Sequence, residues 1–516
     1  MERIITGSDM KKIDRYTIDE IGIPSMVLME RAALSVVNEV TSDFEINSSV
    51  CCVCGVGNNG ADGVAVARIL NNKDYNTSVV IVGDIAKATP DFVKQLSIYK
   101  NTGGKVFERF DDIQNIKMDL FVDALFGVGL SRNVEGKYAE VINCINELCI
   151  PTYAVDIPSG INADNGMKMN VAIKANKTIT FGCLKTGHLY NDGKDYCGKV
   201  ISSDIGFPVF LFDDNNSYKV IEVSDYRIIP KRYSNSNKGT YGKVLVVAGC
   251  DTMSGAAYMC GLASFRMGVG MVKIFTTKGN ETYIKNNLPE AMLTTYQYGD
   301  DYTSDTIEML KNDLEWCDTV VAGPGFGTGK LQINIIKEIL ENSSGVKNIV
   351  FDADAINNIS ENDNLKLLLK KSKCNIVVTP HIGEMSKFAD LDIPTIKLNH
   401  IEATKKIACE YGITVILKDS VTTVTDGKEC YVNVSGNSGM ATAGSGDVLA
   451  GITGAMVSKD MPFTLACAMA AFIHGVAGDF ASKKASQTYM MATDIIEELK
   501  NITNIFDDKQ EARYES

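Results

Sequence analysis

Residues 437–451 read N-S-G-M-A-T-A-G-S-G-D-V-L-A-G, and this stretch decides which fold the second half of the chain forms. Its G-S-G segment lies just before a run of small apolar residues that is typical of a helix. Glycines in this position expose successive backbone N–H groups, and the dipole of the helix strengthens their attraction for an anion. The stretch therefore predicts a phosphate-binding loop at the N-terminus of a helix.

The acid at the end of this loop, Asp447, has two interpretations. An Asp at a helix start often acts as a cap, which stabilises the helix by ~0.5–2 kcal/mol. Beside a bound phosphate, a carboxylate can instead take the proton of an attacking hydroxyl while the loop stabilises the transferred group. The residues of the loop alone leave both interpretations open.

Other motifs of the second half each follow an apolar strand candidate. A P-loop is absent: in the nearest match, F-G-T-G-K-L, Leu331 stands where Ser or Thr would bind magnesium. The strand-end motifs are G-P-G-F-G (323–327), D-A-D-A-I-N (352–357), T-P-H-I-G-E-M (379–385) and L-K-D-S-V-T-T-V (417–424). Because the carboxyl ends of parallel strands meet at one edge of a sheet, we expect these motifs to share a site.

Short apolar runs alternate with helical periodicity along the whole chain, and this predicts an α/β protein. Strands that are apolar throughout indicate parallel sheets covered on both faces. The strand candidates are residues 50–54, 78–82, 120–122, 152–155, 243–248, 319–322, 348–351, 375–379 and 414–418. The helical candidates include residues 63–71, 254–267 and 331–342.

The length of 516 residues favours more than one domain. Helical and strand periodicity breaks off in a polar, basic seam, and we place a boundary near residues 215–225. We expect an N-terminal domain over residues 1–218, a C-terminal domain over 219–505 and a frayed charged tail over 506–516.

The composition narrows the class of protein. A formal charge of −13 argues against non-specific binding of nucleic acid, which needs clustered Lys and Arg. No apolar run of ~18 residues predicts a membrane span, and the N-terminus lacks the apolar centre of a signal peptide. Many of the fourteen cysteines lie inside apolar runs, so we expect a reducing, cytoplasmic setting. No Cys/His spacing resembles a zinc site.

The first half has its own glycine-rich turn, G-V-G-N-N-G-A-D-G at residues 55–63. Gly55, Gly57 and Gly60 match the G-x-G-x-x-G fingerprint after a strand, so an NAD-binding dehydrogenase is one interpretation and a turn without a ligand is another. The amide and carboxylate groups of this loop suit a sugar hydroxyl, a polar ring or a cation better than a pyrophosphate.

Two further loops of the first half bring oxygen-rich side chains to strand ends. They are D-A-L-F-G-V-G-L-S-R-N at residues 123–133 and V-D-I-P-S-G-I-N-A-D-N-G at residues 155–166. Asn59, Asp123 and Ser159 could offer hard oxygens to a monovalent cation, and Asp156 could offer a carboxylate to a substrate. By chemistry alone these residues predict a polar pocket.

The motifs N-N-G-A-D-G, D-A-L-F-G-x-G-L-x-R and D-I-P-S-G together resemble the NAD(P)H-hydrate epimerase domain, the YjeF N-terminal family. The match runs on through T-F-G-C-L-K-T-G-H (180–188) to D-I-G-F-P (204–208). The resemblance implies a Rossmann-like three-layer αβα sandwich that interconverts the R and S hydrates at C6 of the damaged nicotinamide ring. Loss of hydroxide to an iminium and opening of the ring remain alternative routes.

On matching positions, the resemblance implies that Asn59, Asp123 and Ser159 hold potassium and that Asp156 binds substrate and is the catalytic acid/base. The residues that would contact the hydrate are Asn58, Asn59, Gly60, Ala61, Asp62, Gly127, Val128, Gly129, Leu130, Ser131, Arg132, Asn133 and Asp156.

The second half resembles the NAD(P)H-hydrate dehydratase domain, a ribokinase-like α/β family, over residues 238–493. The resemblance rests on K-G-T-Y-G-K-V-L-V-V-A-G, G-P-G-F-G, D-A-D-A-I, T-P-H-x-G-E and above all G-N-S-G-M-A-T-A-G-S-G-D-V-L-A-G. It implies that phosphate passes from ADP to the C6 hydroxyl of the S-hydrate and then leaves, restoring the C5=C6 double bond. Asp447 would be the catalytic base.

The remaining site residues also follow from this resemblance. The hydrate would contact Gly325, His381, Ile382, Gly383, Glu384, Met385, Ser386, Lys387 and Asp447. The nucleotide would contact Lys418, Asn437, Ser438, Gly439, Met440, Ala441, Thr442, Ala443, Gly444, Ser445 and Gly446. A plain turn residue after Pro380 is the alternative for His381.

Fusion of both domains resembles the bifunctional nicotinamide-nucleotide repair family. It implies potassium at the epimerase site, ADP as co-substrate with ATP as an alternative, Mg²⁺ for phosphoryl transfer, a homo-oligomer, and no nucleic-acid or membrane partner. Two other interpretations stay open: an ordinary kinase of a small alcohol, such as a vitamin precursor, and a nucleotide sensor without turnover. Intact Asp447 and Asp156 argue against the sensor.

Overall fold

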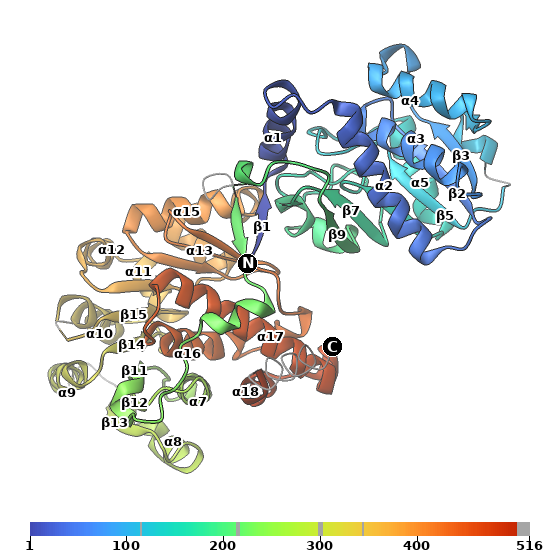
Figure 1. The fold of residues 1–516 in the computed structure, drawn as a ribbon. Coiled ribbons are helices and arrows are strands. Elements are labelled where there is room, and N and C mark those ends of the chain that lie inside the picture. Colours follow the sequence, from blue (N-terminus) through green and yellow to red (C-terminus); the bar gives the residue numbers. More distant parts are fainter. Residues whose placement is uncertain (114–115, 213–216, 298–302, 343–344, 503–516) are drawn as a thin grey trace. The chain divides into compact units, whose positions relative to one another are not determined.

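The structure is a computed structural model that describes residues 1–113, 116–212, 217–297, 303–342 and 345–502. The chain divides into two compact units (Figure 1). We call Arg3–Tyr218 the N-terminal unit, and Lys219–Ser516 together with Met1–Glu2 the C-terminal unit. The charged tail expected at residues 506–516 lies outside the described residues.

The N-terminal unit is built on a parallel sheet of seven strands. Their spatial order is β4 (Lys105–Phe107), β3 (Asn76–Ile81), β2 (Ser49–Cys54), β5 (Leu120–Ala124), β6 (Thr152–Val155), β7 (Lys177–Phe181) and β9 (Lys199–Ser203). The order reverses at β2, which is where a doubly wound sheet opens a crevice at its carboxyl edge. A short strand β1 (Glu2–Ile5) pairs with β8 (Leu184–Lys185).

Helices cover both faces of this sheet. One face packs against α1 (Gly7–Asp19), α2 (Ser25–Asp43), α3 (Asn58–Asn71) and α4 (Pro90–Asn101). The other face packs against α5 (Lys137–Leu148). A short helix, α6 (Gly193–Tyr196), precedes β9. Both faces of the strands are apolar because both are covered, so the predicted three-layer Rossmann-like sandwich is confirmed.

The sheet of the C-terminal unit is parallel over its first seven strands. They are ordered β13 (Met292–Tyr296), β12 (Met271–Thr277), β11 (Lys243–Val247), β14 (Thr319–Ala322), β15 (Asn348–Phe351), β16 (Asn375–Val378) and β17 (Thr414–Leu417). An antiparallel pair follows, β18 (Thr422–Thr425) and β19 (Cys430–Asn433), and β10 (Tyr218–Val220) pairs with β19.

Two helical layers enclose this sheet. One contains α7 (Ser254–Arg266), α8 (Glu281–Asn287), α16 (Ser445–Val457), α17 (Phe463–Tyr489) and α18 (Ala492–Glu498). The other contains α9 (Thr303–Trp316), α10 (Lys330–Glu341), α11 (Asp354–Ser360), α12 (Asp363–Lys371), α13 (Ile382–Ala389), α14 (Ile393–Leu398) and α15 (His400–Tyr411). The α/β class predicted for this half is confirmed.

Helix α17 is the one described helix long and apolar enough to cross a membrane by length and composition. In its most apolar window 78% is buried inside the unit, as expected of a core helix. It packs beside α16, whose residues Val448 to Val457 are all buried (Figure 1).

Candidate functional sites

In the C-terminal unit, the glycine-rich loop at residues 437–444 leads into helix α16. The geometry at the start of this helix decides between the two interpretations of Asp447. Helix α16 begins at Ser445, and its N-cap is Gly444 in the left-handed region (φ 88°) with no side-chain cap. Asp447 is therefore a residue of the first turn and not the cap. The capping interpretation is wrong, because a glycine with positive φ occupies the position where a capping side chain would stand.

A carboxylate from helix α17 anchors the beginning of this loop. Asp479 accepts a hydrogen bond from Gly436 N (3.0 Å) and another from Asn437 Nδ2 (3.0 Å). Asn437 in turn accepts from Gly439 N through its Oδ1 (3.0 Å). Ser445 Oγ, at the start of α16, lies 3.3 Å from Nε2 of His474, which like Asp479 belongs to α17. The loop is therefore held in shape before any ligand binds.

A partly buried ion pair lies beneath the G-S-G segment. Lys418, directly after β17, donates to Asp352 Oδ1 at 2.8 Å, and Thr379 Oγ1 donates to the same oxygen at 2.5 Å. A Cβ at Gly446 would stand 3.4 Å from Lys418 Nζ and 3.8 Å from Asp352 Oδ2. Gly446 therefore lies directly beside this pair.

The acid–base state of Asp447 is set by its surroundings. Burial and, after it, the negative charge of Asp352 raise the pKa of Asp447 to about 7, although the Lys418 ammonium opposes both effects. A carboxylate that titrates near neutral pH can both accept and release a proton under physiological conditions. The site thus combines a glycine-rich loop at a helix N-terminus, an ammonium and a carboxyl with a raised pKa.

The T-P-H-I-G-E-M motif forms the start of α13 next to Lys418. His381 is the N-cap of this helix. Its Nδ1 accepts a hydrogen bond from Gly383 N (2.9 Å), and Glu384 Oε2 accepts one from His381 N (2.8 Å). Lys418 N donates to Pro380 O at 2.8 Å, which joins this turn to the end of β17. His381 is thus a capping residue whose side chain remains 62% exposed and open to a ligand.

The other predicted residues of this half lie in different settings. Gly325, in the left-handed region (φ 56°), lies where a Cβ would approach Ala256 on α7 at 2.7 Å. Ile382 and Met385 are core residues, so their side chains face the interior. Ser386 donates to Leu391 O at 2.6 Å, and Lys387 is exposed. Residues 438–440 form a short 3₁₀ turn, and 441–444 lead into α16.

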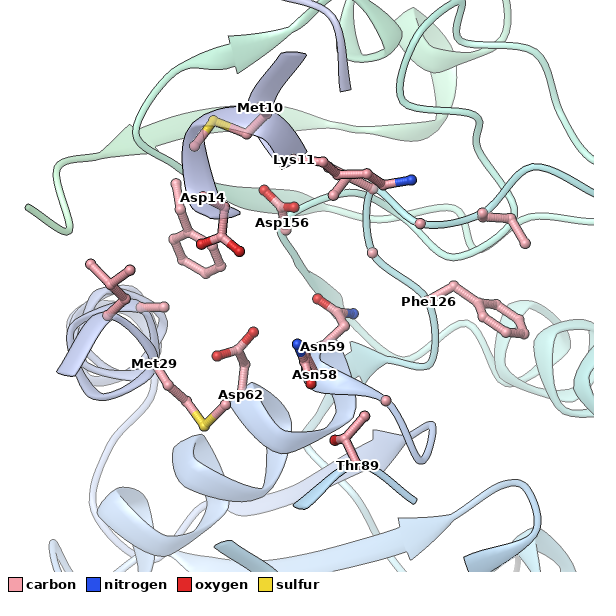
Figure 2. A pocket seen from close by; sticks show the side chains of 18 of the residues that line it. Met10, Lys11, Asp14, Met29, Asn58, Asn59, Asp62, Thr89, Phe126 and Asp156 are labelled. Carbon is pink, nitrogen blue, oxygen red and sulfur yellow. The ribbon is translucent and has the colours of Figure 1, made fainter. Parts of the chain in front are cut away.

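In the N-terminal unit a cavity of about 820 Å³ opens at the carboxyl edge of the sheet. Figure 2 shows that Asp14, Asp62 and Asp156 point into it from three different elements. The predicted residues that line it are Asn58, Asn59, Asp62, Gly127, Val128, Gly129, Leu130, Ser131, Arg132 and Asp156. Gly60, Ala61 and Asn133 are not among its lining residues.

The glycine at position 60 has a packing role instead. A Cβ there would come within 1.8 Å of Gly55 O, so only glycine lets α3 start this close to the end of β2. Ala61 is fully buried in the core on the same side. The G-x-G-x-x-G match therefore reflects helix-to-strand packing, the third role of such glycines in nucleotide-binding folds.

Asp156 lies at the centre of a buried network. It adopts a left-handed backbone conformation (φ 70°), which is strained for a residue other than glycine. Lys185 donates to its Oδ1 (2.8 Å), to Thr180 Oγ1 (2.7 Å) and to Phe181 O (2.8 Å). Burial pushes the pKa of Asp156 upward, but the Lys185 ammonium, helped by His188 and the Thr180 hydroxyl, more than offsets this effect, and the resulting pKa is lowered. Asp156 is therefore held as a carboxylate.

The histidine of the T-F-G-C-L-K-T-G-H motif supports this network. His188 Nδ1 accepts from Lys185 N at 3.0 Å, and Nε2 lies 2.8 Å from the carbonyl oxygen of Asp156, so the proton is assigned to Nε2. Burial lowers the pKa of His188 to about 4. His188 is a neutral structural group that fixes the backbone on both sides of the ion pair.

The other two acids of the cavity have the opposite tendency. Burial and the nearby charge of Asp156 raise the pKa of Asp14, and the same two effects raise the pKa of Asp62 well above its ordinary value. One cavity therefore contains a carboxylate kept ionised beside carboxyls that favour their protonated form. Such a separation of pKa values is how sites assign acid and base roles.

Two of the three proposed cation ligands, Asp123 and Ser159, are in direct contact. Ser159 N and Ser159 Oγ donate to the two oxygens of Asp123 at 2.7 and 2.6 Å, and both residues are fully buried. Burial raises the pKa of Asp123 to about 6, and the groups that offset this are hydrogen-bond donors rather than a cation. The Nδ2 of Asn59 is buried without a partner among the described residues. A buried carboxylate without a countercharge fits a monovalent cation.

Several functional candidates were not found from the sequence. Lys185, Asp14 and Asp479 received no role, and Asp352 and Thr379 were noted only as parts of strand-end motifs. The structure identifies each of them either by a hydrogen-bond partner more than twenty residues away in the sequence or by its place in the lining of the cavity. The signal present was weak: Asp352 is the first residue after an apolar strand, which is where site residues collect.

The C-terminal unit has the fold of a solved ribokinase-like superfamily protein from Enterococcus faecalis V583, which is 26% identical with a TM-score of 0.50 and covers 56% of this chain and 96% of that chain. Fold and site together define an α/β enzyme of the ribokinase-like class joined to a Rossmann-like unit. The NAD(P)H-hydrate dehydratase family matches residues 244–501, and the family of the YjeF-related protein N-terminus matches residues 25–187.

Relatives extend this match to nearly the whole chain. A "Bifunctional NAD(P)H-hydrate repair enzyme Nnr" of Moorella thermoacetica is 32% identical, covering 98% of both chains. A protein of the same name from Thermofilum pendens is 32% identical and covers 94% of this chain and 93% of its own length. The chain belongs to the family of bifunctional NAD(P)H-hydrate repair enzymes.

Proposed function

We propose that the two units repair hydrated nicotinamide nucleotides in sequence. The N-terminal unit interconverts the R and S hydrates at C6, and the C-terminal unit converts the S-hydrate to NAD(P)H with ADP as phosphate donor. Support comes from the two family matches on one chain and from relatives with the same two parts over full length. Fold alone would not distinguish this activity from that of other ribokinase-like kinases.

In the C-terminal unit, Asp447 takes the proton of the C6 hydroxyl as its oxygen attacks the terminal phosphorus of ADP. AMP leaves, and the phosphorylated intermediate then loses phosphate from C6 and a proton from C5, which restores the double bond. The observation that supports this role best is a carboxyl of pKa about 7 in the first turn of the helix that follows G-S-G. Backbone N–H groups and the Lys418 ammonium stabilise the charge on the moving phosphoryl group.

The hydrate would lie between Gly325 and the turn at residues 381–387, and the nucleotide would lie on residues 437–446 beside Lys418. Phosphate oxygens would supply most ligands of an accompanying Mg²⁺, as is usual for nucleotide-bound magnesium. No group of three or more His, Cys, Asp or Glu side chains among the described residues is placed to hold a metal by itself.

In the N-terminal unit, the ionised Asp156 is suited to accept the proton of the C6 hydroxyl or to face the positive charge that develops when hydroxide leaves. Asp14 and Asp62, whose pKa values are raised, are suited to protonate the departing hydroxide. Potassium held by Asn59, Asp123 and Ser159 would supply a fixed positive charge beside the bound nucleotide. Asn58 and the loop at residues 127–133 would contact the rest of the hydrate.

The test is to incubate the protein with a mixture of R and S NADH hydrates and ADP, and to follow the return of the absorbance of reduced nicotinamide. We expect complete recovery of both epimers. Recovery of neither epimer with ADP or ATP would contradict the proposal. Recovery with ATP but not with ADP would show that ATP is the phosphate donor. Consumption of only half the mixture would leave the C-terminal assignment intact and overturn the N-terminal one.

A further inference from the structure

The carboxylate of Asp352 is the most unusual group beneath the phosphate loop. The residue is 1% exposed, and its Oδ2 is buried without a hydrogen-bond partner among the described residues. A buried oxygen without a hydrogen-bond partner costs free energy, so its presence in a folded protein calls for an explanation. The next residue, Ala353, is held in a left-handed conformation (φ 46°), a strain that commonly marks functional sites.

The two oxygens of Asp352 face different partners. Oδ1 receives the Lys418 ammonium at 2.8 Å and the Thr379 hydroxyl at 2.5 Å. Oδ2 points to the first turn of α16, where a Cβ at Gly446 would lie 3.8 Å away. We propose that Asp352 is a positioning residue for phosphoryl transfer, which holds Lys418 at the phosphate loop and sets the basicity of Asp447 through its second oxygen. The proposal rests on the role of Asp447 as the base.

The charged groups around Asp447 come from several elements. Asp352 and Asp354, at the end of β15 and the start of α11, disfavour its ionised form, whereas Lys418 at the end of β17 favours that form. Glu384 on α13 acts on Lys418. His474 on α17 has its pKa lowered to about 4 by burial, and Cys260 on α7 has a raised pKa, so neither is charged near neutral pH.

Removing the charge of Asp352 and removing the charge of Lys418 should shift the pKa of Asp447 in opposite directions. In Asp352→Asn a negative charge disappears, so Asp447 ionises more readily and the acid limb of kcat/KM for the S-hydrate moves down by about one pH unit. In Lys418→Met the positive charge disappears, and the acid limb moves up. Both variants should also lose at least about tenfold in the plateau rate, because the ammonium is misplaced or absent.

The control is Thr379→Val, which removes one hydrogen bond to Asp352 but keeps both charges, so its acid limb should stay at the wild-type pH. Thermal melting, together with ADP-dependent protection of the C-terminal unit, checks that each variant folds. A purely structural role for Asp352 predicts an unmoved acid limb in Asp352→Asn, and that result would overturn the proposal. Activity of Asp352→Asn restored by high Mg²⁺ with an unmoved limb would also overturn it, in favour of a metal-ligand role.

The variant Asp447→Asn separates failure of this proposal from failure of the proposed function. If Asp447→Asn keeps wild-type dehydration, the assigned base is wrong and the proposed function fails at this step. If Asp447→Asn is inactive and the acid limb of Asp352→Asn stays at wild type, only the positioning role is refuted.

Discussion

At the scale of single residues, Lys185 determines the state of the epimerase cavity. Its ammonium is 1% exposed and is the main countercharge of Asp156. Removal of one partner from a buried ion pair leaves the other charge without compensation. The same residue therefore links stability of the N-terminal unit with the ionisation of its proposed catalytic group.

We expect Lys185→Met to destabilise the N-terminal unit by about 3–5 kcal/mol at neutral pH. In the wild type, the lowered pKa of Asp156 contributes stability above its unfolded value of 3.8 that is lost as the pH falls through the folded value. In the variant, protonation of Asp156 relieves the unpaired charge, so the difference from wild type should shrink as the medium is acidified. Denaturant unfolding at several pH values measures this difference.

Lys11→Met is the matched control, because Lys11 lines the same cavity but is exposed. It should change stability little at any pH. Equal destabilisation by both substitutions, or a penalty of Lys185→Met that grows on acidification, would contradict the assigned ion pair.

The sequence showed the chemistry of single residues better than their partners. Asp447 and Asp156 could be proposed because each follows a glycine-rich or strand-end motif. The partners Lys185 and Asp479 could not, since they reach their sites from segments 29 and 43 residues away, and nothing local distinguishes them from surface charges. The core positions of Ile382 and Met385 were also hidden, because a motif match does not show which side of a helix faces the interior.

At the scale of elements, helix α17 supports the phosphate loop through Asp479. We expect Asp479→Ala to raise the KM for ADP by about tenfold or more, because the loop must then be ordered by the nucleotide itself. Epimerisation should stay at the wild-type rate. Steady-state kinetics with ADP as the varied substrate measure the effect.

Ser482→Ala on the same helix is the control, since Ser482 donates only to the backbone oxygen of Asp479. Its KM for ADP should match the wild type. Unchanged ADP kinetics in Asp479→Ala would show that the loop does not depend on this anchor.

A second element-scale prediction concerns α15 and strand β18. His400 lies 3.0 Å from Thr423 Oγ1, and burial lowers its pKa from 6.5 to about 4. The unfolded chain then binds a proton that the folded chain does not, so stability from this group is lost as the pH falls from about 6.5 toward 4. His400→Gln should remove this dependence, by on the order of 2–3 kcal/mol between the two pH values. Parallel stability curves for wild type and variant would contradict the prediction.

The parallel strands were predictable because an apolar run between helical segments has few other solutions. The strands β14, β15 and β6 have the predicted bounds, and the other predicted strands differ by one or two residues at an end. The β18–β19 hairpin was not predicted: T-T-V-T and C-Y-V-N are short and mixed, and their pairing depends on each other rather than on periodicity. The strand β12 was missed for a similar reason, since Lys273 interrupts its apolar pattern.

At the scale of the whole molecule, one chain contains two sites with separate cores and separate chemistry. The central claim is that each site performs one step of one repair. The division predicts that variants of the two sites fail in different ways and complement each other in a mixture.

The most direct measurement is the recovery of NADH from pure R-hydrate with ADP, using Asp447→Asn and Asp156→Asn singly and mixed. We predict that Asp447→Asn forms S-hydrate but no NADH, that Asp156→Asn recovers NADH from S-hydrate but only slowly from R-hydrate, and that the mixture restores recovery from R-hydrate. Wild-type recovery from R-hydrate by either variant alone, or no recovery by the mixture, would contradict the account.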